Sequence, residues 1–397
     1  MMTVDPWRGG VVLNRDILVY ADVDLNLIDG SAVWLASLTE MLSLEPDLSV
    51  HVLLKRPLKQ NRLVKQLLNK SNVRFIDPWS DVDDPAATRA LSRLNRDALD
   101  TEAAATLIQI LDRDIDAGRI LVRGDGILYR ICGDAVISEK LISYITNPPA
   151  YADFEGMQRM IRIHQKSRLT LLQTPMAVDS FTDLLGVRAT RNRIDILNPM
   201  VPDANFEQPM QRQRTPLSLG YSGKFSPPYM IEEMLTAFSS IQKSNSRATF
   251  HVVGDKIHNR PFVEGFEERI RTGLEVGGGV IWHGGVSRER ANQLMGDVMV
   301  ASGWRDPSFD DTVEISTKVL EYAALGVPVL MRPAAVQVAV FGEDMPTWVE
   351  SEAEFKSSFE RLSTDEKFHI EVATSMREAV RSYSMSATNE RLRKHLI

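Results

Sequence analysis

The chain has few of the residues and patterns that several protein classes need. Its 397 residues include one cysteine, Cys132, which excludes an intrachain disulfide and a cysteine-rich zinc site. No apolar run of about 18 residues occurs, so the sequence predicts no membrane-spanning helix. The segment from Met1 to Trp7 lacks the basic and apolar regions of a signal peptide. We therefore expect a cytoplasmic protein.

The overall composition is ordinary, and the charge is mildly negative. A net charge of −7 argues against bulk nucleic-acid binding. With 44% hydrophobic and 25% charged residues, the chain is not of a disordered type. Its length suits two domains of about 150–200 residues each. No G-x-G-x-x-G pattern follows the first expected strand, which disfavours a Rossmann dehydrogenase.

Short apolar segments alternate with helical patterns through the first half of the chain. The expected strands are 16–22, 51–54, 73–76, 120–123, 170–174 and 194–197. The expected helices lie at 32–44, 55–70, 86–118, 135–146, 157–168 and 175–185. This alternation predicts an α/β domain with a parallel sheet covered on both faces.

The pattern restarts after a segment, 199–216, that is rich in Pro, Gln and Arg and reads as a linker. The expected strands of the second half are 217–222, 249–253, 280–283, 298–301 and 327–330. The first four end in small or glycine-rich residues. Because open parallel sheets bind ligands at the carboxyl ends of their strands, these ends predict a site. Helices are expected at 352–363 and 366–396.

The most informative segment is 314–330, which reads as a polar loop, a helix, Gly-x-Pro and a buried strand. Ser316 and Thr317 suit a helix N-cap, where backbone N–H groups point out of the helix end. Lys318 adds a positive charge there, and such an end favours phosphate. Glu321 lies one turn further in, where a carboxylate can accept hydrogen bonds from ribose hydroxyls. The segment predicts phosphate and ribose binding together.

This segment resembles the donor site of retaining GT-B glycosyltransferases, in particular family 4. In that family two glutamates flank the phosphate-binding turn with seven residues between them, and Glu321 matches the second. The first is expected at Val313, and Glu314 is one residue away, as a candidate contact to sugar hydroxyls. The run Ser-Thr-Lys-x-Leu-Glu-Tyr is similar to a branch of cell-surface polysaccharide transferases. The resemblance implies the GT-B fold, two Rossmann-like doubly wound parallel-sheet domains facing across a cleft.

The same resemblance implies a division of the chain. Residues 1–198 are expected to form an N-terminal acceptor-binding domain, joined by the linker 199–216 to a nucleotide-sugar-binding domain at 217–372. Residues 373–397 are expected to form a helix that crosses back to the first domain.

Basic residues at the expected donor site are candidates for a catalytic role. Gly223 and Lys224 follow the first strand of the second domain, where a basic residue of the family contacts the donor pyrophosphate. A second family lysine corresponds here to Tyr229, and Lys318 is expected to supply the missing charge. Cations near a diphosphate leaving group stabilise the charge that builds as the glycosidic bond breaks. Lys224, Glu314 and Lys318 are therefore the candidate catalytic residues.

The remaining candidate contacts come from strand ends in both domains. Gly285 and Val286 resemble the turn whose backbone lines the base pocket of the family. Gly30 and Ser31 match the loop that faces the donor from the N-terminal domain. Arg123 and Asp125, around the end of the fourth expected strand, are the candidate acceptor contacts. No histidine occupies the place usual in the family, so no catalytic base is named.

No metal or cofactor is expected. Asp-x-Asp, the metal-binding pattern of GT-A glycosyltransferases, occurs at 22–24, 81–83, 112–114 and 114–116. Acidic residues are abundant, and these copies fall at a strand end or on helices. GT-B enzymes usually need no bound metal, so the resemblance implies an NDP-sugar as donor substrate only.

Segment 55–70 carries six basic residues and no acidic residue. Its leucines and valine share one face of the expected helix, which suits packing on the sheet. The outward lysines also suit an anionic surface, so peripheral contact with the inner face of the cell membrane stays open.

The predicted function is transfer of a hexosyl group, with retention, from an NDP-sugar to a hydroxyl of a saccharide or lipid-linked saccharide. Such a reaction belongs to polysaccharide or glycoconjugate synthesis. Two alternatives stay open, a GT-B sugar-nucleotide epimerase and a catalytically inactive GT-B subunit that binds a partner.

Overall fold

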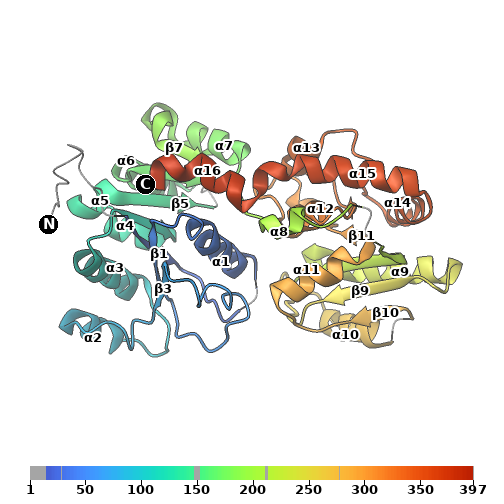
Figure 1. Ribbon diagram of the computed structural model, residues 1–397, viewed down its shortest axis with the longest axis horizontal. Coiled ribbons are helices and arrows are strands. Elements are labelled where there is room, and N and C mark those ends of the chain that lie inside the picture. The colour runs from blue at the N-terminus through green and yellow to red at the C-terminus, as the bar shows by residue number, and fades with distance from the viewer. Residues whose placement is uncertain (1–14, 28, 147–152, 211–212, 277, 397) are drawn as a thin grey trace. The chain divides into compact units, whose positions relative to one another are not determined.

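The computed structural model describes residues 15–27, 29–146, 153–210, 213–276 and 278–396. The chain forms two compact units, which are drawn in Figure 1. Unit 1 contains Met1–Asn198 and Thr388–Ile397, and unit 2 contains Pro199–Ala387. The expectation about residues 1–7 lies outside the described residues.

Unit 1 is built on a parallel sheet that has seven strands within the described residues, in the order β3-β2-β1-β4-β5-β6-β7. The strands are β1 (Asp16–Ala21), β2 (Ser49–Leu53), β3 (Val73–Ile76), β4 (Arg119–Arg123), β5 (Leu141–Ile145), β6 (Leu169–Leu172) and β7 (Ile194–Ile196). The strand order reverses between β1 and β4, which marks the switch point of a doubly wound sheet.

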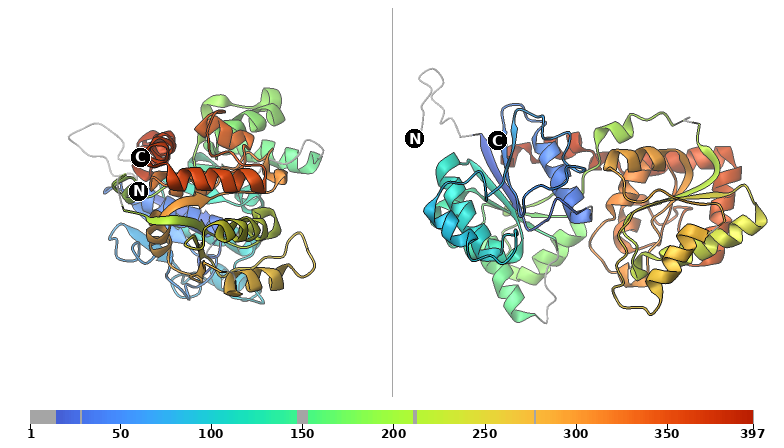
Figure 2. Two further views of the ribbon diagram at one scale, coloured as in Figure 1. Left: turned by 90° about the vertical axis from the view of Figure 1, so that its right-hand side faces the viewer. Right: turned by 90° about the horizontal axis from the view of Figure 1, so that it is seen from below.

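Helices cover both faces of this sheet, as a second viewing direction also shows (Figure 2). They are α1 (Gly30–Leu42), α2 (Pro85–Leu91), α3 (Thr101–Ile115), α4 (Asp125–Ile131), α5 (Ala135–Lys140), α6 (Phe154–Lys166) and α7 (Pro175–Leu185). Because both faces are covered, central strands are apolar throughout: residues 17–20 of β1 are completely buried.

Unit 2 holds a parallel sheet with five strands in the described part of the chain, in the order β10-β9-β8-β11-β12. The strands are β8 (Thr215–Ser222), β9 (Thr249–Val253), β10 (Val280–Trp282), β11 (Val298–Ser302) and β12 (Val329–Leu330). The order reverses between β8 and β11, so the carboxyl ends of these two strands flank the switch point of this unit.

The helices of unit 2 pack around this sheet, with α9 and α14 in contact with each other and α11 in contact with α12. The bounds are α8 (Asp203–Phe206), α9 (Ile231–Ser244), α10 (Phe266–Val276), α11 (Arg288–Gly296), α12 (Thr317–Ala324), α13 (Ala335–Phe341), α14 (Glu352–Thr364) and α15 (Glu366–Ala379). None of the helices that the structure describes is long and apolar enough to cross a membrane.

The expected helix at 135–146 is wrong in its second half. Helix α5 ends at Lys140, and Leu141–Ile145 is the fifth strand of the sheet, buried at every position. A strand buried on both faces has no alternating pattern, so its apolar run cannot be told from a helix by periodicity.

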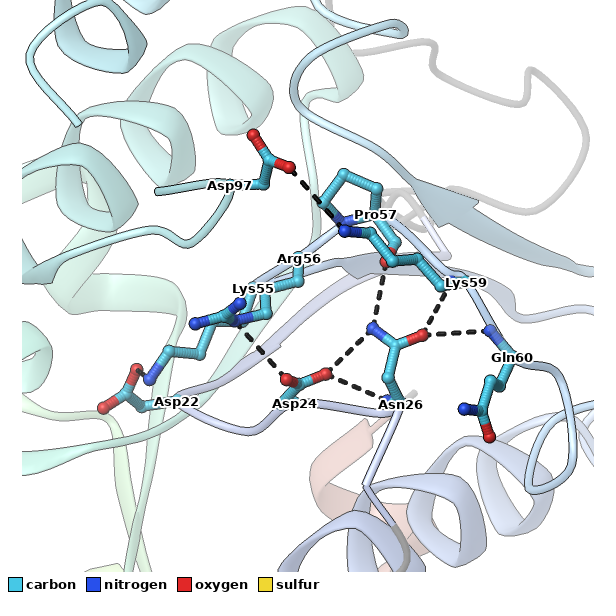
Figure 3. A network of polar contacts seen from close by, with 9 residues as sticks. All are labelled: Asp22, Asp24, Asn26, Lys55, Arg56, Pro57, Lys59, Gln60 and Asp97. Atoms are coloured by element: carbon cyan, nitrogen blue, oxygen red, sulfur yellow. Dashed lines mark hydrogen bonds and ion pairs between the residues drawn. The ribbon is translucent and has the colours of Figure 1, made fainter. Parts of the chain in front are cut away.

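The expected helix at 55–70 is also wrong, since these residues form bends and turns. The side chain of Asn26 replaces helical hydrogen bonds there (Figure 3). Its Oδ1 accepts from the backbone N–H of Lys59 (2.6 Å) and of Gln60 (3.0 Å), and its Nδ2 donates to the carbonyl of Pro57 (3.0 Å). A tertiary contact therefore overrides the local helix preference.

The expected helix at 366–396 is interrupted. Helix α15 ends at Ala379, a 3₁₀ turn covers Arg381–Tyr383, and α16 (Met385–Leu396) follows. Val201 causes the break, because its N–H donates to the carbonyl of Tyr383 (2.9 Å) and its carbonyl accepts from Met385 N (3.0 Å). Those backbone groups are then unavailable for one continuous helix.

Candidate functional site

Helix α12 begins where the sequence predicts, with Ser316 at the N-cap. The Ser316 side chain forms no capping hydrogen bond, and the first helical bond runs from Leu320 N to the Ser316 carbonyl (3.2 Å). The preceding amides therefore have no partner within the helix and suit an anion. Gly326 follows the helix with φ +70° and ends it as predicted.

The turn after β8 lies directly against this helix. A Cβ atom at Gly223 would lie 2.7 Å from Lys318 Nζ, so glycine allows the close approach. The hydroxyl of Tyr322 on α12 accepts from Ser222 N (2.7 Å), which fixes the helix to the strand end. The structure thus brings Gly223, Lys224 and Lys318 together.

Three cations surround the ring of Tyr229, which lies in the 3₁₀ turn Pro227–Tyr229. The Nζ atoms of Lys224 and Lys318 are each 5.0 Å from the ring centroid, and Cζ of Arg305 is 5.3 Å from it. Such distances are within cation–π range. We call Lys224, Arg305 and Lys318 the cation cluster.

Arg305 was not identified from the sequence. It follows β11 by three residues, so the signal that points to it is its place just beyond the carboxyl end of a strand. The cation cluster accordingly spans the switch point of the unit 2 sheet, with Lys224 after β8 and Arg305 after β11.

The cluster is electrostatically unfavourable when empty. Burial lowers the pKa of Lys318 well below its ordinary value, the charges of Arg305 and Lys224 lower it further, and Glu321 acts in the opposite direction. Burial also lowers the pKa of Arg305. The Nζ of Lys318 is buried and has no hydrogen-bond partner among the described residues. A bound anion would relieve this repulsion.

Glu321 forms a partly buried ion pair that the sequence did not predict. Arg288, the first residue of α11, donates to Glu321 Oε1 through Nε (2.9 Å) and Nη2 (2.6 Å). The two charge-assisted hydrogen bonds orient the carboxylate. Arg288 also follows a strand end, since it lies just after the turn that leaves β10.

The glycine-rich turn after β10 packs closely on the neighbouring strand end. The carbonyl of Gly284 accepts from Gly254 N (2.8 Å), and Trp282 Nε1 donates to the carbonyl of Gly254 (2.7 Å). A Cβ atom at Gly285 would collide with the carboxylate of Asp255. Val286, next in the turn, is half-buried.

Glu314 lies in the loop between β11 and α12 and lines a small pocket together with Arg305 and Arg332. Its negative charge raises the pKa of Arg305, in opposition to burial, without forming an ion pair with it in the described chain. Of the cation cluster, Arg305 is the member that lines this pocket with Glu314. Thr317, the first residue of α12, is half-buried beside Lys318.

In unit 1, two of the candidate residues, Ser31 and Arg123, are in contact. Arg123, at the end of β4, donates from Nη2 to Ser31 Oγ (3.0 Å), and its Cζ lies 5.0 Å from the ring centroid of Trp34. Gly30 and Ser31 open helix α1, which Asp29 caps. Ser31 and Arg123 therefore form one polar group at the switch point of this sheet.

Asp125 is the first residue of α4, and burial raises the pKa of its carboxyl group. The nearby charges of Arg159 and Arg123 lower that pKa and only partly offset burial. The carboxyl group is thus more easily protonated than an exposed aspartate.

The Asp-x-Asp copies are used in other ways. Asp22 pairs with Lys55 (2.6 Å), and Asp112 pairs with Lys140 (2.9 Å). Across the described residues, no group of three or more His, Cys, Asp or Glu side chains is arranged to hold a metal ion.

Comparisons with known proteins bear on the fold and on the family of the second half of the chain. Residues 216–365 match the family model described as "Glycosyl transferases group 1". No curated protein matches the sequence. Three solved structures are similar to this chain, and each alignment covers 96% of this chain and nearly all of the other chain.

Those structures are HepE from Anabaena with UDP and glucose (12% identity, 99% of its chain, TM-score 0.67), TarM from S. aureus with Fondaparinux, alpha-GlcNAc-glycerol and UDP (10%, 99%, 0.66), and trehalose-6-phosphate synthase OtsA (11%, 98%, 0.62).

The fold is GT-B, as expected. The match of residues 216–365 to the glycosyl transferases group 1 confirms the expectation of a transferase. The cation cluster and the start of α12 lie within these residues, and they are the strongest candidate for a donor site.

Proposed function

We propose that this GT-B protein moves a hexosyl group from an NDP-sugar to a hydroxyl of a saccharide or lipid-linked saccharide, with retention at the anomeric carbon. The observation that carries the proposal is the cation cluster at the switch point of unit 2, against the start of α12. Concentrated positive charge beside free helix amides suits a diphosphate.

The local geometry of unit 2 supports the main donor contacts of this proposal. Lys224, Lys318 and the first amides of α12 bind the diphosphate. Glu321, oriented by Arg288, accepts hydrogen bonds from the ribose. The backbone around Gly285 and Val286 lines the base, and Gly30 and Ser31 complete the phosphate and sugar contacts.

Glu314 accepts hydrogen bonds from hydroxyls of the transferred sugar, and it lies beside Arg305 of the cation cluster. It takes the role of the family glutamate expected at Val313. The small pocket that Glu314 lines with Arg305 and Arg332 supports this assignment.

The reaction breaks the bond between the anomeric carbon and the diphosphate oxygen, and the electron pair stays on that oxygen. The anomeric carbon then bonds to the acceptor oxygen, and the acceptor proton passes to the departing diphosphate. Lys224 and Lys318 stabilise the charge that builds on the leaving group. A leaving phosphate that takes the proton removes the need for a separate base.

Unit 1 is proposed to bind the acceptor through Arg123 and Asp125. The TarM structure carries UDP together with saccharides, and the HepE structure carries UDP and glucose, which supports a saccharide acceptor and a sugar-nucleotide donor for this chain. Retention, the family 4 relationship and a role in polysaccharide synthesis rest on the resemblance of segment 314–330.

The proposal includes catalysis without a metal and a place in the cytoplasm. It leaves membrane attachment aside, because Lys55, Arg56 and Lys59 of segment 55–70 pair with aspartates of the same unit (Figure 3). These pairs reduce the charge that the segment offers to a lipid surface.

A thermal-shift panel of UDP, GDP, ADP, TDP and their sugars tests the donor assignment. A nucleotide at 100 times its dissociation constant should stabilise the native protein by about 2.7 kcal/mol. Glu321→Ala should abolish the shift, because the ribose loses its acceptor. The matched control is Glu360→Ala on α14, where the exposed glutamate forms an ion pair with Lys356.

Four outcomes separate the alternatives. A panel without any shift, or an unchanged shift in Glu321→Ala, overturns the donor site. Slow release of NDP from the bound sugar nucleotide supports a transferase, whereas binding without turnover supports an inactive subunit. Conversion of the sugar nucleotide to its epimer without NDP release supports an epimerase.

A further inference from the structure

Arg305 has the features of a ligand-binding residue, although nothing in the sequence motif singles it out. Its guanidinium forms no hydrogen bond and no ion pair with any described residue, and its Nε is buried without a partner. An arginine side chain carries only donors and stays charged in proteins. A partly buried guanidinium with unused donors is costly unless a ligand satisfies them.

The side chain is held in place by aromatic rings. Its Cζ lies 5.3 Å from the ring centroid of Tyr229 and 4.9 Å from that of Phe309, and the two rings are 5.7 Å apart. The backbone adds a tie, since Asp306 N donates to the carbonyl of Pro228 (3.0 Å). These ring contacts hold the guanidinium without using its N–H donors.

The position of Arg305 joins it to the two lysines. Tyr229 contacts all three cations, and Lys318 Nζ also lies 4.1 Å from the ring centroid of Tyr221. The Tyr221 hydroxyl donates to the carbonyl of Lys224 (2.7 Å), which holds that residue at the end of β8. Three cations that repel one another are thus fixed around one point by aromatic contacts rather than by carboxylates.

We propose that Arg305 is a direct diphosphate-binding residue, which joins Lys318 in supplying the positive charge that is absent because position 229 holds a tyrosine. The tyrosine at 229 keeps a role in the site, as the surface on which Arg305 and the lysines rest. This inference rests on the proposed function for the identity of the ligand, and on the geometry of the cluster for the anion site.

The role suits a guanidinium better than a lysine. Arginine binds phosphate oxygens with two parallel N–H donors, so it fixes orientation as well as charge. It also stays protonated beside the other cations, where burial lowers the pKa of Lys318. Arg305 therefore supplies a constant charge for the departing diphosphate.

Isothermal titration of the full chain with the nucleotide found in the panel, and with inorganic pyrophosphate, tests the proposal. Arg305→Met keeps the apolar stem and removes the charge, so both ligands should bind about 10- to 100-fold more weakly. Arg305→Lys should restore part of the loss. The matched control is Arg361→Met. Cζ of Arg361 on α14 lies 3.5 Å from the ring centroid of Phe368 on α15, outside the cation cluster, so this variant should leave both affinities unchanged.

The outcomes distinguish this inference from the proposed function. Unchanged nucleotide affinity in Arg305→Met overturns the role of Arg305 and leaves the transferase proposal standing. Pyrophosphate binding that depends on Arg305, without binding of any nucleotide, supports the anion site and overturns the donor assignment. If the unaltered protein binds neither ligand, both are overturned.

Discussion

Lysine and arginine side chains have different partners in the two units. In unit 1, Lys55, Arg56 and Lys59 each lie near an aspartate, namely Asp22 (2.6 Å), Asp24 (3.4 Å) and Asp97 (3.8 Å) (Figure 3). In the cation cluster of unit 2, no ion pair joins a described carboxylate to Lys224, Arg305 or Lys318. Aromatic rings surround those cations instead.

In our proposal this difference separates cations that stabilise the fold from cations that bind a ligand. Exposed ion pairs each contribute about 0–1 kcal/mol to stability and are screened by salt. Buried cations without counter-charges lower stability, and a protein retains such groups where function uses them. The comparison predicts that substitutions in the two groups have opposite consequences for stability and binding.

Lys318→Met should have the largest effect and should act in two directions. The pKa of Lys318 is lowered in the folded protein, so the unfolded chain binds more protons at a pH between the two pKa values. This difference lowers the free energy of unfolding, and the full cost is present below the folded-state pKa. Methionine removes that cost, and the melting temperature of the empty protein should rise by about 2–4 °C. Nucleoside diphosphate affinity should fall about 100-fold.

Differential scanning calorimetry and isothermal titration measure the two effects on the same sample. A lower melting temperature together with unchanged affinity would contradict the comparison, since it would make Lys318 a structural residue. Lys367→Met on α15 is the control, because Lys367 is exposed and paired with Glu371.

Binding of the diphosphate should consume a proton at Lys318. Tyr221, Tyr229, Lys224, Arg305 and Glu321 surround its Nζ, and the cations together with burial keep its pKa low. A bound diphosphate adds negative charge and raises that pKa. Between the two pKa values affinity should rise as pH falls, by at most about tenfold per pH unit for one proton.

Titrations above pH 7 in buffers of different ionisation enthalpy report this proton uptake, because the terminal phosphate, with a pKa of about 6, is then ionised. Lys318→Met should show no uptake. An affinity independent of pH in the unaltered protein would mean that Lys318 is already charged in the empty site.

The sequence predicted most strands because each is a short apolar run between turn residues. It also predicted the start of α12, since Ser316 and Thr317 precede a helical pattern. It missed β5, whose uniform burial removes any periodicity. It gave segment 55–70 a helix because the bonds from Asn26, distant in sequence, leave no local signal.

The candidate site could be predicted from the sequence where neighbouring residues carry the proposed chemistry. Lys224, Lys318 and Glu321 stand in recognisable turns, whereas Arg305 and Arg288 act through neighbours that only the fold brings near. Tyr229 stands where the family resemblance implies a lysine. Only the distances to its ring show that it contacts three cations. Local patterns therefore indicated one side of the site, and the sheet topology supplied the other.

Lys59→Gln should have the smallest effect and so sharpens the comparison from the side of unit 1. The Lys59 side chain is exposed, and its ion pair with Asp97 spans 3.8 Å, so its loss should cost about 0–1 kcal/mol. The backbone N–H of Lys59 keeps its bond to Asn26, which preserves the turn. Urea unfolding should show a small shift, and nucleotide affinity should stay the same. If Lys59→Gln weakened nucleotide binding as Lys318→Met does, ion pairing would no longer distinguish structural cations from ligand-binding ones.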